Sequence, residues 1–215
     1  MQFELASVVP KAIADRPSVL QSDIWGKNIC FSKGKNSKIT APSGTGKTTL
    51  VTILYGLNKN YTGRIGYNEQ DLATINPIEL SELRQAHWSI VFQDLKLFPA
   101  LTARENIELK RSMHKTATES SEIEEMADSL GIQSILQQPA GTCSYGEQQR
   151  IAIARALMQP FDFLLLDEPF SHLDINNKKK AAQLIQKECK KREAGIIITD
   201  LDQDEHFEYQ ESLNL

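Results

Sequence analysis

The chain has 215 residues, enough for one compact domain with a sizeable buried core. Its 24 Lys and Arg side chains are opposed by 28 Asp and Glu, which gives a formal charge of −4 and argues against a nucleic-acid-binding surface. The three cysteines form no C-x-x-C pair, and no apolar run approaches the roughly 18 residues of a membrane helix. We therefore expect a cytoplasmic protein that reaches a membrane only through a partner.

Short strands and turns are expected over the first forty residues, with a strand at 37–40 that leads into a glycine-rich turn. A helix is predicted from about Gly46 to Gly56, because apolar residues recur there at helical spacing. The apolar face of this helix is predicted to comprise Leu50, Ile53, Leu54 and Leu57. Alternating apolar and polar residues then predict a hairpin over 62–72.

The second half of the chain alternates predicted helices with strongly apolar strands. A strand is expected at 89–92, followed by helical structure over 102–131, where Thr102 and Glu105 have capping-box spacing. The other expected elements are a helix at 144–158, a strand at 163–166, a lysine-rich helix at 176–192 and a strand at 196–198. Continuously apolar strands that alternate with helices predict an α/β fold, with a mostly parallel sheet flanked by helices.

Residues 41–49 resemble a phosphate-binding loop, because they carry the pattern G-x-x-x-x-G-K-[ST] with Ala41 in the first glycine position. Glycines let such a loop point its amides at phosphate oxygens, and the positive end of the following helix adds to anion binding. Lys47 is predicted to reach the β- and γ-phosphates of a nucleotide, and the Thr48 hydroxyl to ligate Mg²⁺. The residues predicted to line the nucleotide are Pro42, Ser43, Gly44, Thr45, Gly46, Lys47, Thr48 and Thr49. The motif alone leaves a chance glycine turn as the alternative.

Two carboxylates, Asp167 and Glu168, follow the apolar run at 163–166. They are expected at the carboxyl end of a buried strand, which is where ligands bind in open α/β sheets. Asp167 is predicted to hold a magnesium ion and Glu168 to polarise an attacking water. An exposed acidic turn is the simpler interpretation, which the phosphate-binding loop upstream disfavours.

Ser144 and Glu147 have capping-box spacing at the start of the helix predicted over 144–158, and the small residue Gly146 lies between them. A capped helix terminus can bind an anion through its exposed amides. From these residues alone, an anion site and a simple well-capped helix are equally good interpretations.

Five motifs in chain order resemble the ATP-binding cassette (ABC) family. They are the Walker A loop at 41–49, the Q-loop at Gln93, the signature motif at 143–148, the Walker B strand and glutamate at 163–168, and the D-loop at 171–174. Any one motif is modest evidence, whereas five in order are very specific. The resemblance runs from about residue 24 to the C-terminus. Residues 92–107 are most similar to the branch of lipoprotein release, macrolide efflux and cell division.

The resemblance implies a single ABC ATPase domain over residues 1–215. That domain would be a P-loop NTPase with an N-terminal antiparallel β subdomain and an inserted helical subdomain at about 94–158. The implied function is the ATP-hydrolysing motor subunit of a transporter, peripheral on the inner face of the cell membrane. A separate integral membrane permease would dock near Leu97–Leu101, an apolar stretch for which core packing is nearly as good an explanation.

The family also implies roles for particular residues, with ATP and Mg²⁺ as the bound groups. The catalytic residues would be Glu168, Lys47 and Gln93, and the metal would lie at Thr48, Gln93 and Asp167. Two cassettes, identical or paired, would sandwich two ATP molecules. The residues that contact the ATP held by the other subunit would be Ser144, Gly146 and Glu147.

The sequence departs from the family at several positions. Asp200 replaces the usual switch histidine, and an ionised aspartate repels a phosphate to which a histidine can donate. Tyr145 replaces the first glycine of the signature. Because Asp200 and Tyr145 stand beside an intact Lys47 and Glu168, we expect ATP binding to survive and turnover to be slow. His206 is interpreted as a surface residue, and Trp25 is a weak candidate for stacking on adenine, with core packing favoured.

Two other functions stay open at this stage. One is a cassette protein outside transport, of which the iron–sulfur assembly type is the hardest to exclude by length. The other is a slow ATP-dependent clamp that signals or scaffolds, which the altered switch position keeps open.

Overall fold

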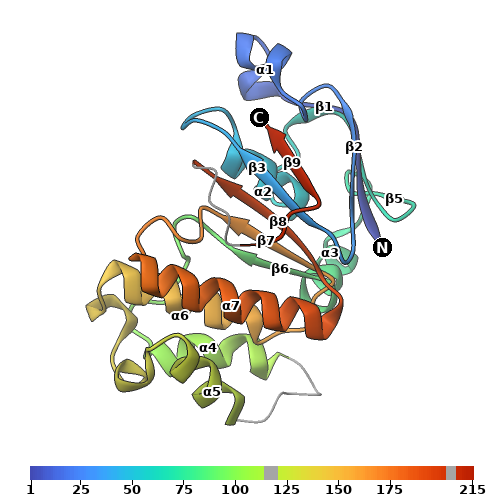
Figure 1. Cartoon of the computed structure of the whole chain (residues 1–215). Helices are drawn as coiled ribbons and strands as arrows, with labels where there is room; N and C mark the ends of the chain where they lie inside the picture. The colour runs from blue at the N-terminus through green and yellow to red at the C-terminus, as the bar shows by residue number, and fades with distance from the viewer. Residues whose placement is uncertain (114–120, 202–206) are drawn as a thin grey trace.

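The computed structural model describes residues 1–113, 121–201 and 207–215, which form two sheets with helices packed around them (Figure 1). The larger sheet is parallel, with its described strands in the order β6 (Trp88–Val91), β7 (Phe163–Asp167), β8 (Gly195–Asp200), β3 (Asn36–Thr40) and β9 (Glu211–Asn214). The smaller sheet is antiparallel, in the order β2 (Asn28–Ser32), β1 (Gln2–Pro10), β4 (Tyr61–Tyr67) and β5 (Gln70–Asp71). The predicted α/β fold with an N-terminal antiparallel β-sheet is confirmed.

The central strands are buried on both faces because helices or the second sheet cover each side. The helices are α1 (Pro17–Gln21), α2 (Lys47–Leu54), α3 (Pro77–Ala86), α4 (Ala103–Ser112), α5 (Ser121–Ser129), α6 (Tyr145–Leu157) and α7 (Ile175–Arg192). The side chains of successive β7 residues point to opposite faces of the sheet, and each face packs against a different hydrophobic core. Leu164 and Leu166 belong to the core formed with α6 and α7, whereas Phe163 and Leu165 belong to the core formed with α2 and the antiparallel sheet.

The stretch predicted to be helical over 102–131 contains two described helices, α4 and α5, and residues 114–120 between them lie outside the described part of the chain. Thr102 and Glu105 form the predicted capping box at the start of α4. Gly131 follows α5 with a φ of +64°, and the next amide, of Ile132, donates to the carbonyl oxygen of Ala127 at 2.8 Å. These helices pack with α6 below the parallel sheet (Figure 1). The boundaries of a helical subdomain at 94–158 stay a prediction.

Helices α2 and α3 differ from the sequence-based prediction. Helix α2 ends at Leu54, so Leu57 does not lie on its buried face and is 53% exposed. Gly56 has a φ of +73° and turns the chain away after the helix. Helix α3 was not predicted, although Asn76 caps it by accepting from two backbone amides and Pro77 occupies its first turn.

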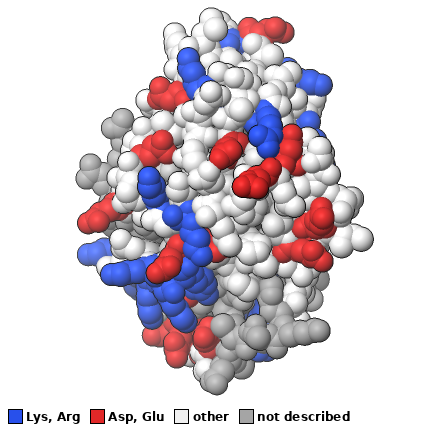
Figure 2. Space-filling view, turned by 90° about the vertical axis from the view of Figure 1, so that its right-hand side faces the viewer, with Lys and Arg blue, Asp and Glu red and all other residues white. Residues whose placement is uncertain are grey.

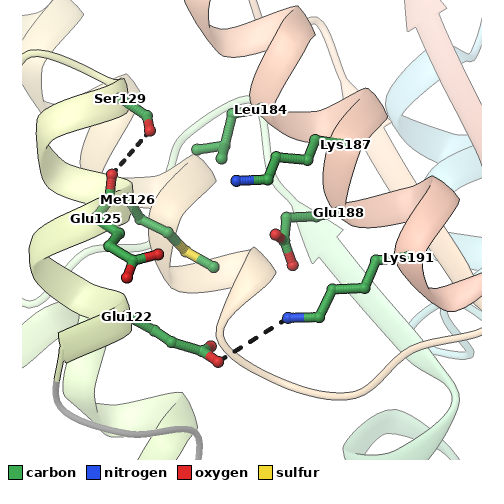
Figure 3. A pocket seen from close by; sticks show the side chains of 8 residues that line it. All are labelled: Glu122, Glu125, Met126, Ser129, Leu184, Lys187, Glu188 and Lys191. Atoms are coloured by element: carbon green, nitrogen blue, oxygen red, sulfur yellow. Dashed lines mark hydrogen bonds and ion pairs between the residues drawn. The ribbon is translucent and has the colours of Figure 1, made fainter.

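Helix α7 is rich in lysine, and its last turn carries Lys190, Lys191 and Arg192. Figure 2 shows a gathering of Lys and Arg side chains on one side of the molecule, interleaved with carboxylates. A groove separates α7 from α5, and across it the ammonium of Lys191 lies 4.0 Å from a carboxylate oxygen of Glu122 (Figure 3). The groove between α7 and α5 is therefore lined by lysines of α7 and by carboxylates such as that of Glu122 in α5. None of the helices in the described ranges is both long and apolar enough to span a membrane.

Candidate functional site

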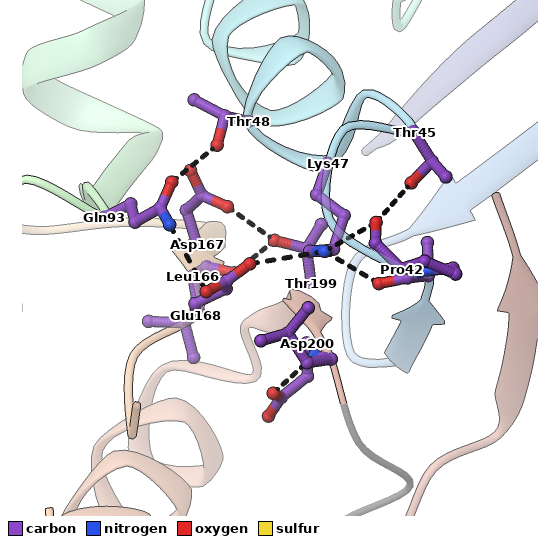
Figure 4. Close-up of polar contacts among 12 residues, drawn as sticks. Pro42, Thr45, Lys47, Thr48, Gln93, Leu166, Asp167, Glu168, Thr199 and Asp200 are labelled. Carbon is purple, nitrogen blue, oxygen red and sulfur yellow. Dashed lines mark hydrogen bonds and ion pairs between the residues drawn. The ribbon is translucent and has the colours of Figure 1, made fainter. Parts of the chain in front are cut away.

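The predicted phosphate-binding loop joins the end of β3 to the start of α2, at the carboxyl edge of the parallel sheet (Figure 1). The ammonium of Lys47 donates to the carbonyl oxygens of Ala41 at 2.7 Å and of Pro42 at 3.0 Å (Figure 4). It also lies 3.3 Å from a carboxylate oxygen of Glu168. The lysine is only 5% exposed. A cation this deeply buried needs such partners, and it is well placed to exchange them for phosphate oxygens.

The left-handed backbone and the close packing beneath the loop both favour a glycine at position 46. Gly46 has a φ of +112°, and a Cβ there would lie 3.1 Å from the Ile13 side chain and 3.3 Å from that of Trp25. Trp25 is 2% exposed, which confirms the prediction of core packing. Its indole supports the loop through a 3.4 Å bond to the Thr45 carbonyl. Ala41 is not among the residues with positive φ, so the Cβ at the first glycine position costs no backbone strain.

Three oxygen-bearing side chains from three different segments converge beside Lys47. The Thr48 hydroxyl lies 3.0 Å from the amide oxygen of Gln93 and also bonds to the carboxylate of Asp167 (Figure 4). Hydroxyl, amide and carboxylate oxygens are the donors that Mg²⁺ prefers. Within the part of the chain that the structure describes, no three His, Cys, Asp or Glu side chains cluster as a metal site. The oxygens of Thr48, Gln93 and Asp167 would fit a magnesium ion that also binds phosphate oxygens and water.

Asp167 is held in place at the end of β7. The hydroxyl of Thr199, from the neighbouring strand β8, donates to its carboxylate at 2.8 Å. Burial raises the pKa of Asp167, and the hydrogen bonds from Thr48 and Thr199 only partly offset this effect. A buried carboxylate whose charged form is disfavoured has the most to gain from a nearby cation, which supports the predicted metal position.

Replacing Asp167 by Asn is expected to raise the free energy of unfolding at pH 7 while weakening Mg²⁺-dependent nucleotide binding. Because the native pKa lies above the ordinary value of 3.8, ionisation of this carboxyl costs stability as the pH rises. The advantage of the variant should therefore shrink as the pH falls and vanish below 3.8. Urea unfolding of both proteins over a range of pH values measures this difference, and equal stability at pH 7 would contradict it.

Glu168 sits at a strained turn directly after β7, with a φ of +48°. One oxygen of its carboxylate faces Lys47, and the other accepts from the side-chain amide of Gln93 at 3.3 Å. Its backbone amide donates to the Thr199 carbonyl at 2.9 Å. The strained turn thus aims the carboxylate at the centre of the loop, where a water attacking a bound phosphate would need a base.

The candidate signature residues form the N-terminus of α6. Ser144 caps the helix and forms the predicted capping box with Glu147. A Cβ on Gly146 would lie 3.0 Å from the carbonyl oxygen of His172, so a larger residue would push against this backbone. Ser144 and Glu147 hydrogen-bond to each other at the start of the helix. Tyr145 approaches the phosphate-binding loop, because it lines a pocket together with Thr48 and Asp167.

Comparison with known proteins decides the family. Residues 26–171 match the family model described as ABC transporter, which covers more than half of the chain. The chain belongs to the ABC transporter family. It is an ATP-binding cassette ATPase, as its ordered motifs imply.

Known relatives are similar to most of this cassette. YvcR of Bacillus subtilis, an uncharacterised ABC transporter ATP-binding protein, is 34% identical over 177 residues, which is 81% of this chain and 68% of YvcR. The thiamine import ATP-binding protein ThiQ of Haemophilus influenzae is 34% identical over 173 residues, 80% of this chain and 78% of ThiQ. The macrolide export protein MacB of a Shewanella species is 33% identical over 174 residues, 80% of this chain and 27% of MacB. The relatives thus include proteins named for import and for export.

Solved structures of the bacterial cassette MJ0796 have the same fold as this chain. A dimeric structure is 26% identical with a TM-score of 0.78, and the alignment covers 92% of this chain and 87% of the other. A dimeric post-hydrolysis state of MJ0796, bound to ADP and Pi, is 26% identical with a TM-score of 0.76, and covers 93% and 88% of the two chains. The second structure agrees with ATP hydrolysis as the activity of this kind of cassette.

The switch position of this cassette lies at the end of β8. The Asp200 carboxylate accepts a hydrogen bond from the backbone amide of Leu201 at 2.7 Å. The backbone carbonyl of Asp200 accepts from the backbone amide of Ala41 at 3.2 Å. The aspartate therefore stands next to the phosphate-binding loop, where the resemblance places it. Slow turnover stays a prediction, and His206 lies outside the described residues.

One buried residue near the site was missed in the sequence. Gln149 is buried in α6, and its side-chain amide donates to the Glu168 carbonyl at 3.2 Å and to the Ser171 hydroxyl at 3.4 Å. Its amide oxygen accepts from the backbone amide of His172 at 3.1 Å. Gln149 thus ties the signature helix to the Walker B glutamate and the D-loop. The only sequence signal was a glutamine at a helix position that turns out to face the core.

Proposed function

We propose that this cassette binds Mg²⁺–ATP at residues 42–49 and hydrolyses it with Glu168 as the general base. The observation that carries the proposal is the convergence of Thr48, Gln93 and Asp167 beside the buried ion pair of Lys47 and Glu168. A buried cation, an oxygen-rich metal position and a carboxylate base are the parts that phosphoryl transfer to water requires.

Each side chain has a distinct role in this proposal. Lys47 exchanges its contacts with the loop carbonyls and Glu168 for the β- and γ-phosphates. Thr48, Gln93 and Asp167 hold the metal, which when bound neutralises phosphate charge and orients the triphosphate. Glu168 is then free to accept a proton from the attacking water. The amides at the start of α2 complete the phosphate cradle.

The signature residues act on the ATP of a second cassette in this proposal. The likeness to the dimeric MJ0796 structure supports a head-to-tail dimer in which two ATP molecules lie between the subunits. Ser144, Gly146 and Glu147 would then reach the nucleotide of the partner subunit.

The motor acts on a separate membrane permease, and the cassette is peripheral on the cytoplasmic face. The segment 97–101 is the proposed docking surface. Phe98 is 56% exposed there, whereas Leu97 is partly buried against the core. Exposed apolar side chains at the surface suit contact with a helix of a partner.

A Phe98→Asp variant is expected to lose at least about fivefold in affinity for the permease while keeping its affinity for Mg²⁺–ATP. A charge placed in an apolar contact is left without a partner, which costs about 1–3 kcal/mol or more. Co-purification of the permease with the cassette identifies the membrane protein, and titration of the two measures affinity. Leu20→Asp is the matched control, because Leu20 is exposed in α1 and outside the docking surface. An unchanged affinity in Phe98→Asp would contradict this docking site.

A further inference from the structure

The signature helix contacts the Q-loop of its own chain through Tyr145, the residue that replaces a signature glycine. The Tyr145 hydroxyl donates to the backbone carbonyl of Gln93 at 3.2 Å. Its ring lies against the ring of His172, with 4.2 Å between the centroids. One side chain in the first turn of α6 therefore touches both the Q-loop and the D-loop.

A second side chain of the same helix fixes the other end of the Q-loop segment. Arg155, in the last turn of α6, donates to the carbonyl oxygens of Leu95 at 2.5 Å and of Lys96 at 2.7 Å. These two residues have φ values of +58° and +47°, a conformation that costs a non-glycine backbone free energy. The guanidinium stabilises this turn. Two side chains of α6 thus donate hydrogen bonds to three backbone carbonyls of the Q-loop segment, those of Gln93, Leu95 and Lys96.

The Gln93 side chain extends from this fixed backbone into the nucleotide site. Its amide oxygen lies 3.0 Å from the Thr48 hydroxyl, and its amide nitrogen donates to Glu168 at 3.3 Å. The carbonyl that Tyr145 holds belongs to the same residue, so the tyrosine helps to fix the backbone position from which the Gln93 side chain extends. Tyr145 and Asp167 also line the same pocket.

We propose that Tyr145 is a positioning residue, which holds Gln93 at the metal end of the nucleotide site and couples that site to the signature helix. The inference rests on the proposed role of Gln93 as a metal ligand. The competing explanation is that Tyr145 merely packs its ring on His172, at a position where it is 43% exposed. The two explanations differ in the role of the hydroxyl, because a phenylalanine would keep the packing and lose the bond.

The test is a Tyr145→Phe variant with two readouts. The first is the Mg²⁺ concentration that half-saturates binding of a fluorescent ATP analogue, and we expect it to rise about two- to tenfold, the range of one lost hydrogen bond. The second is amide hydrogen exchange in residues 93–96 without metal or nucleotide, which should become faster. Affinity for the analogue in EDTA should stay unchanged, since the phosphate-binding loop is untouched.

Two further variants distinguish failure of the positioning role of Tyr145 from failure of the metal role of Gln93. Tyr61→Phe removes a hydroxyl from a partly buried tyrosine in β4 and should move neither readout. Gln93→Ala should raise the half-saturating Mg²⁺ concentration at least as much as Tyr145→Phe. If Gln93→Ala shifts it and Tyr145→Phe does not, the positioning role is overturned and the proposed function stands. If neither shifts it, Gln93 is no metal ligand and both proposals fail together.

Discussion

Replacing Lys47 by Ala is expected to weaken ATP binding by roughly 30-fold or more. The ammonium is buried and already held by two loop carbonyls and Glu168, so it is preorganised for the phosphates. Removing one partner of a buried, hydrogen-bonded charge pair costs about 2–5 kcal/mol, which corresponds to roughly 30- to 5,000-fold in affinity. Isothermal titration with Mg²⁺–ATP measures the loss.

The matched control is Lys179→Ala, which removes an exposed lysine from the second turn of α7 and costs little helix propensity. That variant should bind ATP like the unmodified chain. Thermal unfolding without nucleotide shows that Lys47→Ala is folded. A folded Lys47→Ala variant that binds ATP within threefold of the unmodified chain would contradict the assignment of residues 42–49 as the phosphate site.

Replacing Glu168 by Gln is expected to slow ATP hydrolysis by about 10²–10⁴-fold, the usual contribution of a general base. The amide has nearly the shape of the carboxylate but does not accept a proton at neutral pH. ATP binding should survive because the phosphate-binding loop is unchanged. The variant should therefore accumulate as an ATP-bound dimer, which phosphate release and light scattering would report together.

Glu193→Gln is a close control for this variant. Glu193 is an exposed glutamate at the end of α7 with a φ of +52°, so the same substitution is made at a similar backbone conformation away from the site. It should hydrolyse ATP at the normal rate. If Glu168→Gln keeps the rate of the unmodified chain, another group is the base. A Glu168→Gln protein that lost hydrolysis but kept its cellular role would point to an ATP-dependent clamp instead of a transport motor.

Elements with strong local signals were predictable from the sequence to within about a residue. The helix predicted at 144–158 is α6, Tyr145–Leu157, with caps at Ser144 and Met158. Its capping box and apolar periodicity are both local, as is the continuously apolar run that forms β7. The Walker A and Walker B residues were found because their spacing follows from the loop and strand that carry them.

Features that depend on tertiary contacts were missed. Strand β9 is the short polar sequence Glu211–Asn214, and it becomes a strand only by pairing in parallel with β3. The bond from Tyr145 to Gln93 joins residues 52 positions apart, and nothing local indicates it. The roles of Gln149 and Arg155 likewise follow from packing, since a helix sequence does not show which polar side chain meets a distant carbonyl.

The most direct test of the account is an isothermal titration of Mg²⁺–ATP into the unmodified chain. The account predicts one nucleotide bound per chain, with affinity that falls when Mg²⁺ is removed with EDTA, because Thr48, Gln93 and Asp167 then lose the ion they surround. A titration with no heat of binding, confirmed by the absence of nucleotide-induced thermal stabilisation, would contradict the proposed site and the functions built on it.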